Sequence, residues 1–134
     1  MIEEIIGKPY KNGGRGPDYF DCYGLVRFMY NKVLNIELPE YTNYEEGWYK
    51  SCDILKDKLE EFSKLWVPVC IPKMWDILTF SHGNTSITNH CGLYIGNDKM
   101  IHCYEKQPVV IDRVTKPYWK GHLTGIMRYN VSNN

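Results

Sequence analysis

Four short runs of β-branched and aromatic residues follow one another in the second half of the chain, with no helix pattern between them. Turn-forming residues separate these runs, as they separate the strands of hairpins. The runs are residues 76–80, 90–95, 100–104 and 109–112, and a last strand is expected from about Leu123 to Tyr129. Because consecutive strands with short connections pair antiparallel, the sequence predicts an antiparallel sheet in this half.

The first half has the periodicity of helices instead. Residues 2–6 predict a short helix. Apolar residues from Cys22 onward share one face of a second helix, which is expected to end near Asn35. A third, amphipathic helix is expected from an N-cap at Ser51 to Trp66. Helices first and consecutive strands afterwards define the α+β class, with N-terminal helices packed on a C-terminal antiparallel β-sheet.

Length and charge narrow the class of protein. The 134 residues are expected to form a single domain, residues 1–134, with one hydrophobic core. The 16 basic and 16 acidic residues are interspersed, which argues against a nucleic-acid partner and against a membrane-surface patch.

No stretch approaches the roughly 20 apolar residues of a membrane span. Glu3 and Glu4 stand where a signal peptide would be basic, so we expect synthesis and retention in the cytoplasm unless another machine exports the protein.

Cysteine usage predicts reduced thiols, because five cysteines without CxxC spacing do not match a disulfide framework. Cys52 and Cys70 are expected to belong to the scaffold.

Cys22 differs from the other cysteines in its position. The glycine-rich residues 12–17 before it cannot be helical, so Cys22 stands in the first turn of its helix. Unpaired backbone N–H groups and the helix dipole favour the reactive thiolate there. A small buried core residue is the other interpretation of this position.

Two histidines supply the further groups that a cysteine nucleophile needs. If the strands that carry them form a hairpin, His90 and His102 share a face only across a three-residue loop, residues 96–98. A two-residue turn would place them on opposite faces. With the longer loop, His90 is expected beside the Cys22 thiol as general base. His102 then lies behind His90, bonds to its other ring nitrogen and fixes the tautomer of His90. His82 and His122 are assigned to loops without a catalytic role.

A zinc site is the competing use of the same side chains, because Cys22, His90 and His102 could supply three ligands. The cysteines that follow the two histidines do not add ligands. Adjacent strand residues point to opposite faces, so Cys91 and Cys103 are expected in the core when the histidines face a cleft. No metal and no cofactor is therefore expected.

Several stretches, taken in order, resemble one family of enzymes. They are Gly7-Lys8-Pro9-Tyr10, Gly13-Gly14, residues 20–26 (FDCYGLV), residues 76–80 (DILTF), residues 90–97 (HCGLYIGN) and Met100-Ile101-His102. Together they resemble the NlpC family of papain-like cysteine peptidases, and the match spans residues 7–104. The resemblance implies a papain-like fold and cleavage of the stem peptides of bacterial peptidoglycan, often between D-glutamate and the following diamino acid. It assigns the catalytic roles to Cys22, His90 and His102.

The resemblance also implies a substrate-binding region, which places Tyr10 and Asp21 near the nucleophile. Tyr23 stands where many members have a serine that helps the preceding aspartate to hold the free amine of the stem peptide. Trp75 replaces a usual glycine. The aromatic residue after the cysteine and the stretch 36–41 (IELPEY) look most like the branch found in phage and prophage tail-tip proteins. Tail-tip proteins are therefore expected partners, and the cell wall is the expected place of action.

Three functions stay open from the sequence. The leading one is a peptidoglycan endopeptidase, of the γ-D-glutamyl-diamino acid type, in which the thiolate attacks a stem-peptide carbonyl and backbone N–H groups hold the oxyanion. The second is a structural tail component with a vestigial cysteine site. The third is an acyltransferase or thioesterase on the same fold, which the order of cysteine before histidine favours less.

Overall fold

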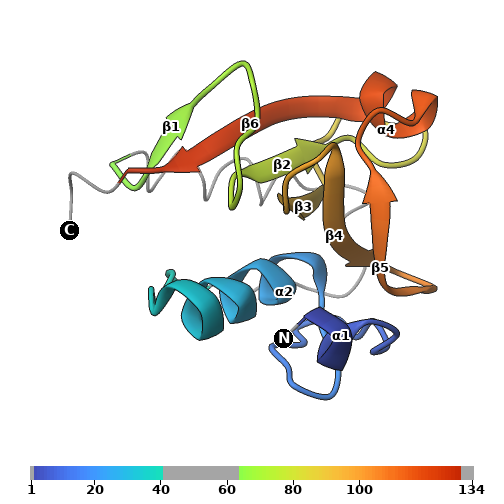
Figure 1. The fold of residues 1–134 in the computed structure, drawn as a ribbon. Coiled ribbons are helices and arrows are strands. Elements are labelled where there is room, and N and C mark those ends of the chain that lie inside the picture. Colours follow the sequence, from blue (N-terminus) through green and yellow to red (C-terminus); the bar gives the residue numbers. More distant parts are fainter. Residues whose placement is uncertain (1, 41–63, 131–134) are drawn as a thin grey trace.

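The computed structural model of the chain describes residues 2–40 and 64–130. In these residues short helices pack with a six-stranded antiparallel sheet (Figure 1). The helices are α1 (Ile2–Ile5), α2 (Cys22–Met29) with its π-helical continuation η1 (Tyr30–Leu34), and α4 (Pro117–His122). The strands are β1 (Trp66–Pro68), β2 (Ile77–Phe80), β3 (His90–Tyr94), β4 (Lys99–Tyr104), β5 (Gln107–Arg113) and β6 (Leu123–Tyr129). The α+β class is confirmed.

The sheet has the strand order β1-β6-β2-β3-β4-β5, and each neighbouring pair is antiparallel. The five predicted strands correspond to β2 through β6. The helix that begins at Cys22 ends as predicted, because η1 ends at Leu34 and the next residue, Asn35, has a left-handed φ of 57°. Within the part of the chain that the structure describes, no helix is both long and apolar enough to cross a membrane.

The first strand corrects the sequence prediction. Trp66 was expected to end a helix, but it begins β1, and residues 51–63 of that expected helix lie outside the described residues. The Trp66 ring packs edge-on against Tyr30 and Tyr129, and its backbone pairs with Tyr129 of β6. Pro68 is tolerated in this strand because β1 forms an edge of the sheet.

Helix α4 is a second correction, because His122 was expected in a loop and is the last residue of this helix. The sequence carried a signal for it. Pro117 stands at the helix start, where its missing N–H group removes no helical hydrogen bond. Trp119 then buries its ring against the sheet.

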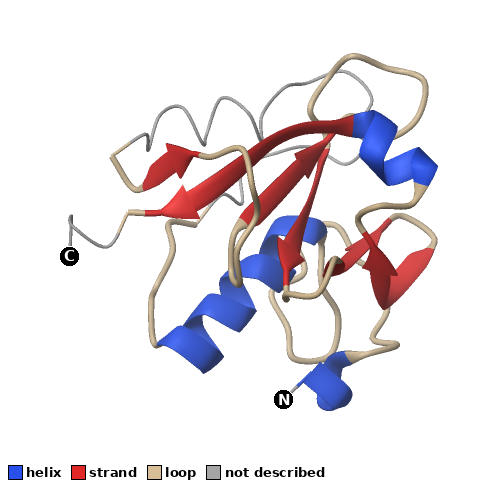
Figure 2. Cartoon of the chain, turned by 45° about the horizontal axis from the view of Figure 1, so that its top comes forward, coloured by secondary structure: helices blue, strands red, loops and turns tan. Residues whose placement is uncertain are grey.

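The sheet has a separate core on each face. Figure 1 shows α2 along one face, and Figure 2 shows α4 leading into β6. The α2 core combines helix residues with alternate strand residues, among them Leu25, Val26, Met29, Ile77, Cys91, Leu93, Ile101 and Cys103. The other core packs Leu78, Phe80, Met100 and Ile126 around Trp119. Cys91 and Cys103 are fully buried, as expected.

Candidate functional site

Cys22 is the first residue of α2, in the turn that the sequence predicts. Before it, the backbone of Asp21 is extended, and the Asp21 carboxylate accepts a hydrogen bond from the N–H of Gly24 at 2.6 Å. An aspartate at this position satisfies an N–H group that has no helical partner, which explains why the helix starts here. The Cys22 side chain is 4% exposed, so the thiol is nearly covered in the free protein.

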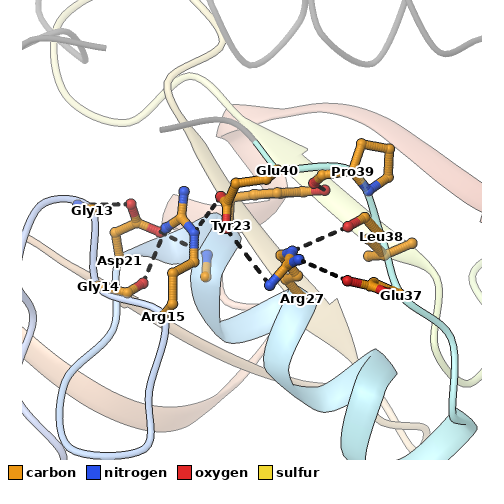
Figure 3. Close-up of polar contacts among 11 residues, drawn as sticks. Gly13, Gly14, Arg15, Asp21, Tyr23, Arg27, Glu37, Leu38, Pro39 and Glu40 are labelled. Atoms are coloured by element: carbon orange, nitrogen blue, oxygen red, sulfur yellow. Dashed lines mark hydrogen bonds and ion pairs between the residues drawn. The ribbon is translucent and has the colours of Figure 1, made fainter. Parts of the chain in front are cut away.

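The glycine-rich loop is fastened to this helix start (Figure 3). The N–H of Gly13 donates to one oxygen of Asp21 at 3.0 Å, and Nη1 of Arg15 donates to the other oxygen at 2.9 Å. Arg15 also donates through Nε to Glu40 at 2.6 Å. Asp21 and Arg15 therefore connect the loop, the start of α2 and the segment that follows η1.

Tyr10 and Tyr23, two residues expected to contact a substrate, lie against or within the core cluster that contains Cys22. Tyr10 forms a β-bridge with Phe20 and packs against the core cluster that contains Cys22. The Tyr23 hydroxyl donates to the carbonyl oxygen of Pro39 at 2.6 Å (Figure 3). The Tyr23 side chain therefore holds the segment after η1 against α2.

The strands β3 and β4 form the hairpin that a shared histidine face requires. Tyr94 pairs with Met100, and the loop between the strands consists of residues 96–98, all with positive φ angles. This is the three-residue loop of the sequence hypothesis. His90 and His102 consequently lie on one face, with Nε2 of His90 2.8 Å from Nδ1 of His102.

Asp112 of β5 extends this pair into a chain of three side chains. Nε2 of His102 donates to Asp112 at 2.8 Å, and Nζ of Lys116 donates to the other carboxylate oxygen at 2.5 Å. Burial alone would raise the pKa of Asp112, but the hydrogen bonds from Lys116 and His102 outweigh burial and lower this pKa. An ionised carboxylate only accepts, so His102 carries its proton on Nε2 and accepts at Nδ1 from His90. Nδ1 of His90 is then left unprotonated, as a general base requires.

Both imidazoles are buried, with His90 1% exposed and His102 fully covered. Three aromatic rings surround His90 at 5.4 to 5.7 Å between centroids, and they belong to Phe80, Tyr104 and Trp119. Burial lowers the pKa of His90 well below its ordinary value, and the neighbouring His102 adds to this effect. Burial also lowers the pKa of His102, although Asp112 acts in the opposite direction.

The Cys22 thiol lies beside Cys91. A hydrogen bond with Cys22, together with burial, raises the pKa of Cys91 well above its ordinary value, and both residues belong to the α2 core. Cys91 directly follows His90 in β3, and neighbouring strand residues point to opposite faces. The structure therefore brings Cys22 to the first residues of β3, and joins His90 to His102 and Asp112 on the other face. Among residues 2–40 and 64–130, no three histidine, cysteine or acidic side chains are grouped to hold a metal ion.

Comparison with known proteins shows which family this arrangement belongs to. The sequence model described as NlpC/P60 family matches residues 7–128. This chain belongs to the NlpC/P60 family. The probable endopeptidase YafL of Escherichia coli K12 is 30% identical over 129 residues, which cover 95% of this chain and 47% of that protein. The tail tip assembly protein K of Escherichia phage lambda is 24% identical over 128 residues, covering 96% of this chain and 60% of that protein.

Solved NlpC/P60 structures share the fold. The crystal structure of a lipoprotein-like NLP/P60 family protein from Staphylococcus aureus matches with a TM-score of 0.67 at 22% identity, covering 95% of this chain and 38% of that chain. The family and the fold expected from the residues are both confirmed. The chain spans about half of YafL and 60% of the phage protein.

The buried histidines of this NlpC/P60 protein are expected to make its stability sensitive to acid. An unfolded histidine has a pKa near 6.5, whereas burial lowers the pKa of His90 in the folded protein. Between these two pKa values the unfolded chain binds more protons, so the free energy of unfolding falls as the pH drops below about 6.5. We expect the midpoint of urea unfolding to decrease between pH 7.5 and pH 5.5, and to decrease less in His90→Gln. The matched control is His122→Gln, and an equal decrease in all three proteins would contradict this expectation.

Proposed function

We propose that this NlpC/P60 protein is a cysteine peptidase that hydrolyses peptide bonds in the stem peptides of bacterial peptidoglycan. One observation carries the proposal: a cysteine at a capped helix start lies beside β3, and the first residue of β3 is His90. His90 belongs to a hydrogen-bonded chain with His102 and Asp112. The similarity to a probable endopeptidase supports the class of reaction. The finer proposal is cleavage between γ-D-glutamate and the following diamino acid.

In this reaction Cys22 is the nucleophile and His90 is the general base. The thiol gives its proton to Nδ1 of His90, and the sulfur attacks the stem-peptide carbonyl while backbone N–H groups at the start of α2 hold the oxyanion. His90 then protonates the leaving amine and activates the water that hydrolyses the thioester. His102 keeps the imidazole in the required tautomer, and Asp112 does the same for His102.

The proposed nucleophile and base both lie near the start of β3, with Cys22 beside Cys91 and His90 on the opposite face of the strand. His90 is the first residue of this strand, and Cys91 holds the Cys22 thiol one residue further along. The His90 ring and the Cys22 thiol lie on different faces of β3, so we infer that they approach each other around the end of this strand. Substrate entry then requires the side chains that cover them to move apart, because Cys22 is 4% and His90 1% exposed.

The residues next to the nucleophile would contact the stem peptide. Tyr10, Asp21 and Tyr23 are the proposed contacts, on the basis of the family resemblance and of their position around the start of α2. We also infer that tail-tip proteins deliver the enzyme to the cell wall. The similarity to a phage lambda tail tip assembly protein supports this partner.

The proposal is tested by digesting purified peptidoglycan with the protein under reducing conditions. Products are separated by liquid chromatography and identified by mass spectrometry. We expect new peptide ends at the γ-D-glutamyl bond of the stem. Ends at another stem bond would retain the peptidase and correct the specificity. A folded protein that releases no new ends would contradict the proposed function.

A second candidate function is a structural tail component with a vestigial cysteine site. The burial of Cys22 favours it, because a working nucleophile must reach its substrate. Labelling with iodoacetamide near neutral pH distinguishes the two functions, with the exposed Cys70 as an internal standard. Labelling of Cys70 without any labelling of Cys22, together with co-purification with tail proteins, would favour the structural role.

A further inference from the structure

A pocket of about 620 Å³ opens on the sheet face away from α2, between β4, β5 and α4. Its lining includes Tyr104, Gln107, Asp112, Lys116, Tyr118 and Trp119. We propose that this pocket binds a segment of the acetamido-sugar chain of peptidoglycan. The proposal rests on the function proposed above, and it adds a second contact with the same polymer, next to the histidine chain rather than at the Cys22 thiol.

The aromatic side chains of the pocket are already fixed in place. The ring of His82 lies 4.4 Å from that of Tyr104, and the ring of Tyr118 lies 4.8 Å from that of Trp119, between centroids. The Tyr118 hydroxyl bonds to Nδ1 of His82 at 2.7 Å and accepts from the N–H of Gly83 at 2.9 Å. Rigid aromatic faces offer a large contact area for the apolar face of a sugar ring at little cost in conformational entropy.

The charges of the pocket favour an uncharged ligand. Asp112 and Lys116 form an ion pair at 2.5 Å, so the single carboxylate and the single ammonium group compensate each other. Asp112 would repel an anionic ligand in this pocket, and Lys116 would repel a cationic one. A neutral sugar avoids both repulsions, and its hydroxyl and acetamido groups can bond to these side chains and to the amide of Gln107.

The position of the pocket connects it with the catalytic side chains. Asp112 lines the pocket and also accepts the hydrogen bond from His102. Tyr104 and Trp119 line the pocket and also contact the ring of His90. A sugar bound here would therefore lie against the back of the histidine chain, and it would keep the enzyme on the glycan strand while a stem peptide reaches Cys22.

Binding is measured with the tetramer of N-acetylglucosamine, in a Cys22→Ala background so that no substrate is cleaved. We expect saturable shifts of the β5 and α4 amide signals in an NMR titration. Tyr118→Ala removes one aromatic face and should weaken binding roughly tenfold. Gln107→Ala should weaken binding about threefold through one lost neutral hydrogen bond. The control is Tyr19→Ala, because Tyr19 and Tyr118 are both 42% exposed and Tyr19 lies in the loop before α2.

Two results would overturn the inference. The first is that the folded protein does not bind the tetramer, or binds it equally in the Tyr118, Gln107 and Tyr19 variants. The second is that a sugar-free stem peptide occupies the same amides and displaces the tetramer. Cleavage of soluble stem peptides by the parent protein is measured separately. A parent that cleaves these peptides without binding the sugar would refute the pocket and leave the peptidase intact.

Discussion

Replacement of Cys22 by alanine is expected to reduce peptidoglycan turnover by roughly 10⁴-fold or more. The variant retains His90, His102 and the backbone N–H groups of α2, but no atom remains to form the thioester. The expected loss therefore tests the role of the sulfur and not the integrity of the site. Turnover is measured as the initial rate of release of new peptide ends in the peptidoglycan digest.

A matched cysteine variant provides the control for this loss. Cys70 is exposed, so Cys70→Ser should keep turnover within twofold of the parent rate. Cys22→Ala should still unfold cooperatively, because alanine continues the first turn of α2 and leaves the Asp21 cap in place. Turnover by a folded Cys22→Ala protein above about one hundredth of the parent rate would assign the nucleophile to another residue.

The sheet could be predicted because its strands are short runs of β-branched and aromatic residues and its connections contain turn residues. The two elements that were missed are short. The apolar residue Trp66 fits the end of a helix as well as an edge strand, and only its contacts with Tyr30 and Tyr129 decide between them. Pro117 is the sequence signal for α4, but a proline marks the start of a helix only when helical residues follow it.

The sequence predicts that His90 and His102 act together, but it does not fix the register of the two strands that carry them. A loop of residues 96–98 and a tighter turn both fit the sequence, and only the longer loop places His90 and His102 together. Asp112 was missed because its role depends on the pairing of two strands. Met100 pairs with Asp112, which brings the carboxylate diagonally across from His102.

Trp75 shows how a departure from a family pattern is accommodated. The resemblance marked this position as a usual glycine, and the backbone of Trp75 has a φ of 75°, in the left-handed region that favours glycine. Two hydrogen bonds hold this conformation. The Trp75 N–H donates to the carbonyl of Tyr94 at 2.8 Å, and the Tyr30 hydroxyl donates to the carbonyl of Trp75. The chain therefore holds tryptophan in a backbone conformation that would suit glycine.

Gly24→Ala is expected to destabilise the protein by about 3 kcal/mol, against the usual preference of helices for alanine. A Cβ atom at residue 24 would lie 1.9 Å from the carbonyl oxygen of Gly14 and 3.0 Å from a carboxylate oxygen of Asp21. The Gly14 oxygen belongs to the backbone and accepts from the N–H of Asp21, so it cannot move away without breaking that bond. The control is Gly121→Ala in α4, because a Cβ atom there meets nothing within 4 Å.

Urea unfolding of the two glycine variants measures this effect. Gly121→Ala should unfold at or slightly above the parent midpoint, since alanine gains up to about 1 kcal/mol over glycine in a helix. A midpoint for Gly24→Ala at the parent value would show that the loop moves freely from the helix. If the clash instead separates the loop from α2, the N–H of Gly13 and the guanidinium of Arg15 lose their bonds to Asp21 together. The capped helix start that positions Cys22 then loosens, so turnover should fall even at urea concentrations where the variant remains folded.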